Sequence, residues 1–219
     1  LSSVASGHDN PEGYRFVEFP LYNIAAVIAD KLFQGYTLEY SGRLTSIFAS
    51  VATLIFLYLL TKKYFGTRVA FLTAFFFAVL PYNIFWSRVI LPEPTLVMLT
   101  TGALYCFDLW VETGKKRFWM LTSLFGAFGL LVKFTTLFFA IPALYLIWRK
   151  WGAKSFYNPW LYLLGVVILA PTLLWRWHIS HYPEGIPAYS WLLNGNGIRF
   201  KGAWWWWLFA ERIGKLILG

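Results

Sequence analysis

Long apolar runs alternate with short polar segments along this chain. Five of the runs contain no charged residue, and they cover positions 44–61, 69–87, 118–132, 134–148 and 155–175. A further run, 91–110, opens with Pro92, Glu93 and Pro94, and both a proline and an acid are favoured in the first turn of a helix. An α-helix needs about 20 mainly apolar residues to cross a bilayer. The pattern therefore predicts an all-α, polytopic membrane protein with about six spans, two of them short.

The basic residues between these runs indicate how the spans are oriented. They form three clusters: Lys62, Lys63 and Arg68; Lys115, Lys116 and Arg117; and Arg149, Lys150 and Lys154. Basic residues in short loops mark the cytoplasmic side of a membrane protein. All three clusters share that side only if residues 118–148 cross the membrane twice, as two short spans. We therefore expect a helical hairpin there, with Lys133 at its outer turn.

Composition supports the membrane assignment. Hydrophobic residues make up 58% of the chain and charged residues 13%, whereas an average soluble domain has about 25% charged residues. The net charge is +9, but nine of the 19 basic residues belong to the three clusters. Membrane orientation and anionic lipid therefore explain the charge better than nucleic acid does. The single cysteine, Cys106, excludes a disulfide framework and a cysteine-based metal site within the chain.

We expect the chain to divide into three regions. Residues 1–43 form an external loop, in which positions 20–34 show the apolar spacing of a helix lying in the membrane interface. Residues 44–175 form the transmembrane bundle. Residues 176–219 form a second external loop, a tryptophan-rich interfacial helix around 204–207, and the start of a further span. Both ends of the chain are expected to be cut within a longer protein.

The predicted external face collects carboxylates, basic groups and imidazoles at headgroup depth. Its members are Asp9, Glu12, Glu18, Glu93, Glu184, Arg88, Arg176, Arg199, Lys201, His178 and His181, with Lys133 at the hairpin turn. Cations bind phosphate, and a carboxylate serves as a base or a metal ligand, so this set suits a lipid-borne phosphate. Simpler roles are open as well: Glu93 caps its helix, Lys133 extends to the interface, and the histidines are ordinary loop residues.

Several short segments resemble the GT-C glycosyltransferases that use polyprenyl-phosphate donors. They are EFPLYN at 18–23, SGRL at 41–44, YLL at 58–60 with KYFG at 63–66, SR at 87–88 with LPE at 91–93, and GLLVK at 129–133. More narrowly, the chain is similar to the bacterial and archaeal branch related to protein O-mannosyltransferases and to the lipid A aminoarabinose transferase. Phe19 departs from the aminoarabinose branch, where a lysine is common.

The resemblance implies a GT-C-like helix bundle with an external active site, in a bacterial or archaeal plasma membrane. There a sugar passes from a polyprenyl phosphate to a protein, lipid or glycan acceptor, with inversion at the anomeric carbon. A carboxylate deprotonates the acceptor, and in this family it lies just upstream of the segment that matches Glu18. We therefore expect the main base upstream of the chain, with Glu93 and Asp9 as the catalytic candidates within it.

The resemblance also suggests which residues bind the substrate. Glu18 and Lys133 match family residues near the donor or a metal ion, and Arg88 and Arg176 are further candidates for binding the substrate. A divalent metal ion is a candidate cofactor, with Glu18, His178 and His181 as its candidate ligands.

Two other functions fit the same basic external groups. One is a transporter or flippase for a lipid-linked or anionic substrate, and the other is a non-catalytic membrane assembly subunit. Paired broken helices in two related halves would favour the transporter, and no such pairing is visible in the sequence.

Overall fold

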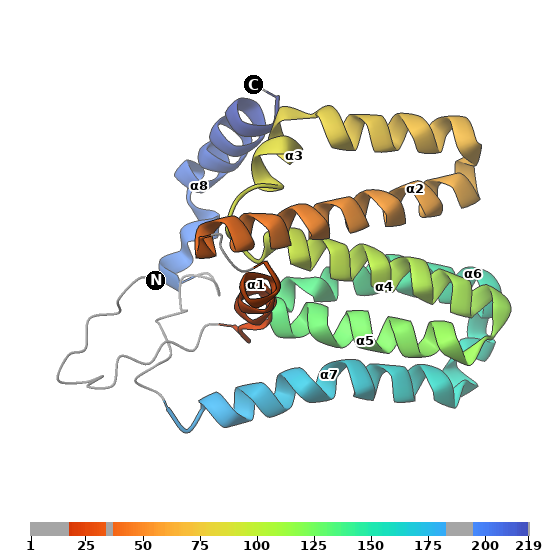
Figure 1. The fold of residues 1–219 in the computed structure, drawn as a ribbon. Coiled ribbons are helices and arrows are strands. Elements are labelled where there is room, and N and C mark those ends of the chain that lie inside the picture. Colours follow the sequence, from red (N-terminus) through yellow and green to blue (C-terminus); the bar gives the residue numbers. More distant parts are fainter. Residues whose placement is uncertain (1–17, 34–36, 183–194, 219) are drawn as a thin grey trace. The chain divides into compact units, whose positions relative to one another are not determined.

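The computed structural model describes residues 18–33, 37–182 and 195–218, and these residues are helical with no strand among them (Figure 1). Two compact units are present. The larger one covers Glu18–His178, and the other includes the described residues from Ile179 onward. The prediction of an all-α membrane protein is confirmed, because three of the described helices are long and apolar enough to cross a bilayer: Leu38–Val79, Glu93–Thr113 and Pro159–Ile179.

Helix α2, Leu38–Val79, contains two of the predicted apolar runs. The chain reverses at Gly66, whose φ of 83° and ψ of 174° are not helical, so that α2 consists of two antiparallel arms (Figure 1). A φ in this region is open to glycine at little steric cost. The rings of Tyr58 and Phe71, one on each arm, lie 5.4 Å apart edge to face.

The second arm is shorter than the sequence predicts. The apolar run 69–87 was expected to form a single span to about Trp86, but α2 ends at Val79 and a separate short helix, α3, covers Pro81–Trp86. Leu80 between them is extended, with φ −62° and ψ 126°. The cause is Pro81, since proline disfavours helical geometry in the residue before it. This break places α3 beside the start of the next helix.

Helices α4, Glu93–Thr113, and α5, Lys116–Val132, are antiparallel neighbours joined at Gly114, whose φ is 64°. They pack through small residues, as membrane helices commonly do. A Cβ atom at Gly102 on α4 would lie 2.9 Å from the ring of Phe56 on α2, and one at Gly126 on α5 would lie 2.9 Å from Ile168. The glycines therefore set how closely α2, α4, α5 and the helix that contains Ile168 approach.

The helical reversal predicted for residues 118–148 is confirmed, while the crossing of the membrane by its two arms stays a prediction. Helix α5 ends at Val132, and Lys133 is extended, with φ −159° and ψ 131°. The chain then returns through the 3₁₀ turn η1, Phe134–Phe139, and helix α6, Ala140–Trp151. A second 3₁₀ turn, η2, Gly152–Tyr157, leads into α7, Pro159–Ile179 (Figure 1).

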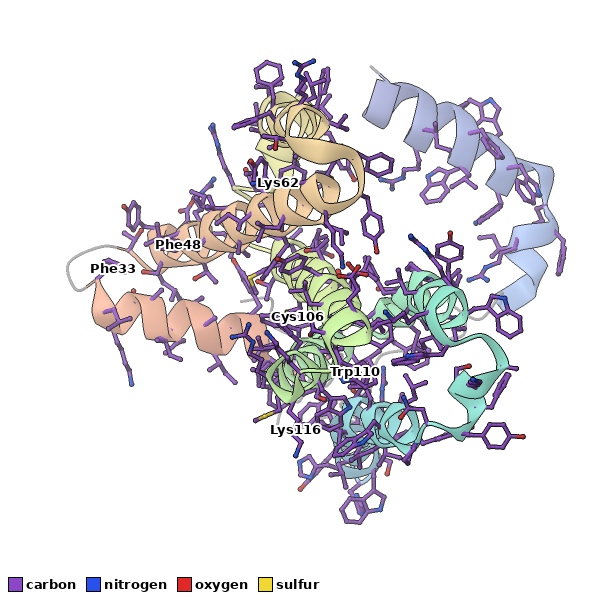
Figure 2. The ribbon with its side chains drawn as sticks, turned by 90° about the vertical axis from the view of Figure 1, so that its right-hand side faces the viewer. Phe33, Phe48, Lys62, Cys106, Trp110 and Lys116 are labelled. Carbon is purple, nitrogen blue, oxygen red and sulfur yellow. The ribbon has the colours of Figure 1, made fainter. Side chains whose placement is uncertain are left out.

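The three turns that carry the basic clusters lie at one end of the larger unit, as Figure 1 shows for the reversals at Gly66, at Gly114 and at η2. Figure 2 views this unit from that end, with the labelled Lys62 and Lys116 on different helices. Many large apolar side chains face outward, among them Phe48 with 60% of its surface exposed. An exposed apolar surface of this kind suits contact with lipid.

Helix α1, Leu21–Leu32, runs across the bundle and is seen nearly end-on in Figure 1. It begins after Pro20 and buries Tyr22 and Ala26. The hydroxyl of Tyr22 donates to the carbonyl of Gly42 at 2.8 Å and so holds α1 against α2. The helix predicted over 20–34 is therefore present.

The smaller unit contains the 3₁₀ turn η5, Gly195–Phe200, helix α8, Gly202–Trp206, and the π-helix η6, Trp207–Leu218. Trp205, Trp206 and Trp207 are all exposed, at 50%, 61% and 42%. The predicted tryptophan-rich helix is thus helical, with its indole rings on the surface. An interfacial position for it stays a prediction.

Candidate functional site

A lysine and a glutamate meet at the end of the bundle opposite the basic turns. Lys133 Nζ lies 2.7 Å from Glu93 Oε1, and about a third of each side chain is exposed. Glu93 occupies the first turn of α4, where the helix dipole favours a negative charge. Lys133 follows the last turn of α5, where the dipole favours a positive charge. Each charge is therefore stabilised by the helix end at which it lies.

Glu18 joins this pair from the segment before α1. The backbone N–H of Phe19 donates to the carbonyl of Leu131 at 3.1 Å, and the Phe19 ring packs edge to face on Trp175 of α7 at 5.1 Å. These contacts anchor the segment between the end of α5 and α7. Glu18 is thereby fixed beside the Lys133 turn.

The electrostatics of Glu18 show which charges surround it. Burial raises the pKa of this carboxyl above its ordinary value of 4.5, the charge of Lys133 lowers it, Glu93 raises it, and Arg176 lowers it. The carboxyl therefore feels two cations and one other carboxylate. Glu18, Glu93, Lys133 and Arg176 form one group, called here the outer cluster.

A cavity of about 290 Å³ adjoins Glu93. It is lined by Ser50, Thr53, Phe77, Tyr82, Asn83, Trp86, Ser87, Glu93, Pro94 and Val97. Glu93 Oε2 is buried and accepts no hydrogen bond from the residues that the structure describes. The carboxylate thus has one oxygen engaged by Lys133 and one that retains its capacity to accept.

Arg88 lies on a different cavity. This second hollow, of about 440 Å³, is lined by Arg43, Pro81, Ile84, Phe85, Arg88 and Val89. Arg43 donates to the carbonyl oxygen of Arg88 at 3.4 Å and pairs with Glu39 at 2.8 Å. The structure therefore gathers Glu18, Glu93, Lys133 and Arg176, while Arg88 faces a separate hollow with Arg43.

A divalent metal ion as cofactor stays a prediction. No group of three His, Cys, Asp or Glu side chains able to hold one exists in the parts of the chain that the structure describes. Glu18, one of the three candidate ligands, is surrounded by the cations Lys133 and Arg176, which oppose a further positive charge. His178 packs its ring 5.7 Å from Trp175, and His181 belongs to the smaller unit. We assign no step to a metal ion.

The sequence candidate Asp9 lies outside the described residues. The cavity residues Tyr82, Asn83 and Trp86 were missed, because their segment was taken for part of a membrane span. A signal was present in the sequence: Asn83 is an amide within an apolar run and follows Pro81.

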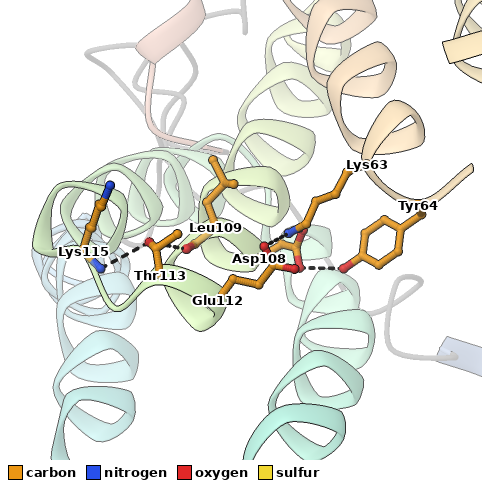
Figure 3. Close-up of polar contacts among 7 residues, drawn as sticks. All are labelled: Lys63, Tyr64, Asp108, Leu109, Glu112, Thr113 and Lys115. Carbon is orange, nitrogen blue, oxygen red and sulfur yellow. Dashed lines mark hydrogen bonds and ion pairs between the residues drawn. The ribbon is translucent and has the colours of Figure 1, made fainter. Parts of the chain in front are cut away.

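A second polar cluster, called here the inner cluster, joins α2 to α4 near the reversal at Gly66 (Figure 3). Asp108 on α4 is 2% exposed, pairs with Lys63 on α2, and accepts a hydrogen bond from Tyr64 at 2.6 Å. Lys63 also contacts Glu112 at 2.9 Å. These contacts tie the first arm of α2 to α4 just before the chain reverses at Gly66. These contacts lie within the bundle and join two of its helices.

Comparison with known proteins identifies a family. The family model of dolichyl-phosphate-mannose-protein mannosyltransferases matches residues 19–177. The matched range contains Glu93, Lys133 and Arg176, and it begins one residue after Glu18. No curated protein and no solved structure matches the chain.

Proposed function

We infer that this chain takes its sugar from a polyprenyl phosphate and acts at the outer cluster. The chain belongs to the dolichyl-phosphate-mannose-protein mannosyltransferase family and is a membrane glycosyltransferase of that type. The observation that carries this proposal is the convergence of Lys133 and Arg176 on two carboxylates at one end of the helices. A lipid-linked glycosyl phosphate presents its charge at headgroup depth, where such helix ends lie.

The reaction needs a group that stabilises the departing phosphate. When an acceptor hydroxyl attacks the anomeric carbon, the bond from that carbon to the phosphate oxygen breaks and polyprenyl phosphate leaves with an added negative charge. Lys133 and Arg176 are placed to bind that charge, and fixed cations in a partly dehydrated site stabilise developing charge strongly. Glu93, held 2.7 Å from Lys133, positions the ammonium group.

The same reaction releases the proton of the acceptor hydroxyl, which a carboxylate takes up. Of the two catalytic candidates from the sequence, Glu93 lies in the outer cluster. Glu18 lies close enough to share in orienting the donor or the acceptor.

We propose that the outer cluster faces the extracytoplasmic side. Support comes from the positions of the basic residues: the turns that carry Lys62, Lys116 and Arg149 lie at the opposite end of the bundle (Figure 1). Short basic loops remain on the cytoplasmic side. A bacterial or archaeal plasma membrane is the setting in which we place the protein.

The test is sugar transfer in membranes that contain the protein. Membranes are supplied with radiolabelled polyprenyl-phosphate mannose, and label is followed into protein, lipid and glycan fractions. We expect transfer by the wild type and by Lys62→Ala, a lysine substitution at the far end, and none by Lys133→Ala at equal protein level. Movement of the intact labelled lipid across the membrane without transfer would instead identify a flippase.

A further inference from the structure

The cavity beside Glu93 is lined mainly by aromatic, amide and hydroxyl side chains, and the roles proposed for the charged residues do not explain them. It lies between both arms of α2, the short helix α3 and the first turn of α4, and is called here the α3 cavity. We propose that the α3 cavity is the subsite for the neutral hexosyl ring of the donor, with Asn83 and Trp86 as its specificity residues. This inference rests on the proposed function, because the donor is the one named there.

The hydrogen-bonding groups on the cavity wall include both donors and acceptors. Asn83 donates through Nδ2 to the carbonyl of Phe77 at 3.0 Å, Ser87 donates to Ile84 at 2.9 Å, and Ser50 donates to Ser46 at 2.9 Å. The oxygens of these side chains can still accept, while the second amide N–H of Asn83, the hydroxyl of Tyr82 and the indole N–H of Trp86 can donate. A ligand whose groups both donate and accept, as the hydroxyl groups of a hexose do, complements such a wall.

Aromatic rings form the other part of the wall. The rings of Tyr82 and Trp86 lie 5.9 Å apart at an interplanar angle of 53°, so they form a corner. Tyr82 is 45% exposed, which leaves its ring surface open to a ligand. A pyranose ring has C–H faces that pack on aromatic surfaces. A wall that combines apolar rings with a few placed polar groups is typical of small-molecule sites.

The charge of the cavity favours a neutral sugar. Glu93 is the one charged side chain among the described residues that line it, and Lys133 neutralises that carboxylate at 2.7 Å. An amino sugar would gain little from a carboxylate that is already paired. A uronic acid would bring a second carboxylate beside Glu93, and like charges repel. A neutral sugar avoids that repulsion, and its hydroxyl groups can pair with the amide and hydroxyl groups of the wall.

Size and position agree with a single sugar ring. A volume of about 290 Å³ is at the small end of ligand cavities. Glu93 belongs both to the cavity wall and to the outer cluster, so a ring held in the cavity has its neighbouring phosphate on the side of Lys133 and Arg176. The α3 cavity therefore binds the sugar of the donor, and the outer cluster binds its phosphate.

The experiment compares two ligands that differ only in the sugar. The purified protein in lipid nanodiscs is titrated with a short-chain polyprenyl-phosphate mannose and with the same polyprenyl phosphate without mannose. We expect the wild type to bind the mannosylated lipid about tenfold more tightly, the effect of one or two good hydrogen bonds and their packing. In Trp86→Ala and Asn83→Ala this preference should disappear, while affinity for the bare lipid is unchanged.

Two further variants separate loss of the subsite from misfolding. Trp148→Ala, which removes an exposed tryptophan from α6, should keep the preference, and Trp86→Phe should keep most of it because an aromatic ring remains. Equal binding of both lipids by the wild type, or an unchanged preference in Trp86→Ala, would overturn the proposal.

Failure of the proposed function gives a different result, namely no binding of either lipid. Methyl mannopyranoside then tests the cavity directly by saturation-transfer NMR. Signals from the wild type that are lost in Trp86→Ala would support the subsite without the lipid, and absence of signals from the wild type would overturn it.

Discussion

The two ends of the helix bundle carry polar clusters of opposite character. In the inner cluster, Asp108 is buried and both its oxygens are engaged, one by Lys63 and the other by the hydroxyl of Tyr64 at 2.6 Å. In the outer cluster, Glu93 and Lys133 remain about one third exposed, and Glu93 Oε2 accepts no hydrogen bond from the described residues. One cluster is complete in itself, whereas the other retains capacity for a ligand.

The difference shows how burial separates a structural ion pair from a functional one. A buried carboxylate that loses its partner leaves an uncompensated charge, so the inner cluster holds two helices in register. A half-exposed pair contributes little to stability. The position of the outer pair at the ends of α4 and α5 is therefore better explained by binding than by folding.

The largest expected effect is on catalysis in the outer cluster. Lys133→Ala should lower kcat/KM for sugar transfer by about 100-fold or more, the range found when a charge-stabilising group is removed from an active site. The thermal unfolding midpoint should stay close to that of the wild type. Assaying transfer at matched protein levels checks this, with Lys62→Ala as the control. Full activity of Lys133→Ala would remove the lysine from the mechanism.

The next effect is on stability in the inner cluster. Asp108→Ala leaves Lys63 with only the exposed carboxylate of Glu112, and we expect it to destabilise the protein by about 3 kcal/mol. Transfer activity per folded molecule should persist at low temperature. Thermal unfolding in detergent measures the change. Glu112→Gln is the matched control and should cost less than about 1 kcal/mol, because its side chain is 49% exposed.

A smaller effect is expected for the hydroxyl group of Tyr64. Tyr64→Phe removes one hydrogen bond to Asp108 but keeps the ring and the ion pair with Lys63. The free energy of unfolding should fall by about 1.5–2 kcal/mol, the lower part of the range for a hydrogen bond to a charged group. A loss equal to that of Asp108→Ala in the same unfolding assay would mean that the tyrosine, and not the lysine, dominates the cluster.

The smallest effect concerns the pH dependence of transfer. Burial raises the pKa of Glu18 and the charge of Arg176 lowers it, so Arg176→Gln should raise that pKa further. If Glu18 acts in its ionised form, the acidic limb of the pH–rate profile should move to higher pH in this variant.

A raised carboxyl pKa contributes stability at acidic pH that is lost as pH rises through it. Glu18→Gln should therefore reduce the loss of stability toward neutral pH.

Control for that profile comes from Arg149→Gln, which removes an arginine at the far end of the bundle and should leave the acidic limb in place. A shift to lower pH in Arg176→Gln would show that Arg176 does not act on Glu18 as an opposite charge does.

Much of the fold could be predicted because the length of an apolar run and the charges beside it involve residues that are close together in the chain. The positions of the basic clusters required a hairpin in residues 118–148, and the turn at Lys133 is where the sequence indicated. The start of α4 at Glu93 followed from the two prolines around it. These predictions depended on residues close together in the chain.

The rest depended on contacts between distant residues. Lys63 and Asp108 are 45 positions apart, and no periodicity indicates that they pair. Asn83 and Trp86 were hidden in an apolar run, and only the break at Pro81 turns them into a cavity wall beside Glu93. Arg88 was a candidate for binding the substrate, and the turn after α3 places it on the hollow with Arg43.

The central claim is that the outer and inner clusters lie at opposite membrane faces, with Lys133 outside. Labelling of single cysteines with a membrane-impermeant maleimide on intact cells tests it most directly. Cys106 is buried and is the one cysteine of the chain, so Cys106→Ala gives a cysteine-free background. In this background we predict that Lys133→Cys reacts in intact cells and that Lys62→Cys reacts only after permeabilisation. Reaction of both positions from the same side would contradict it.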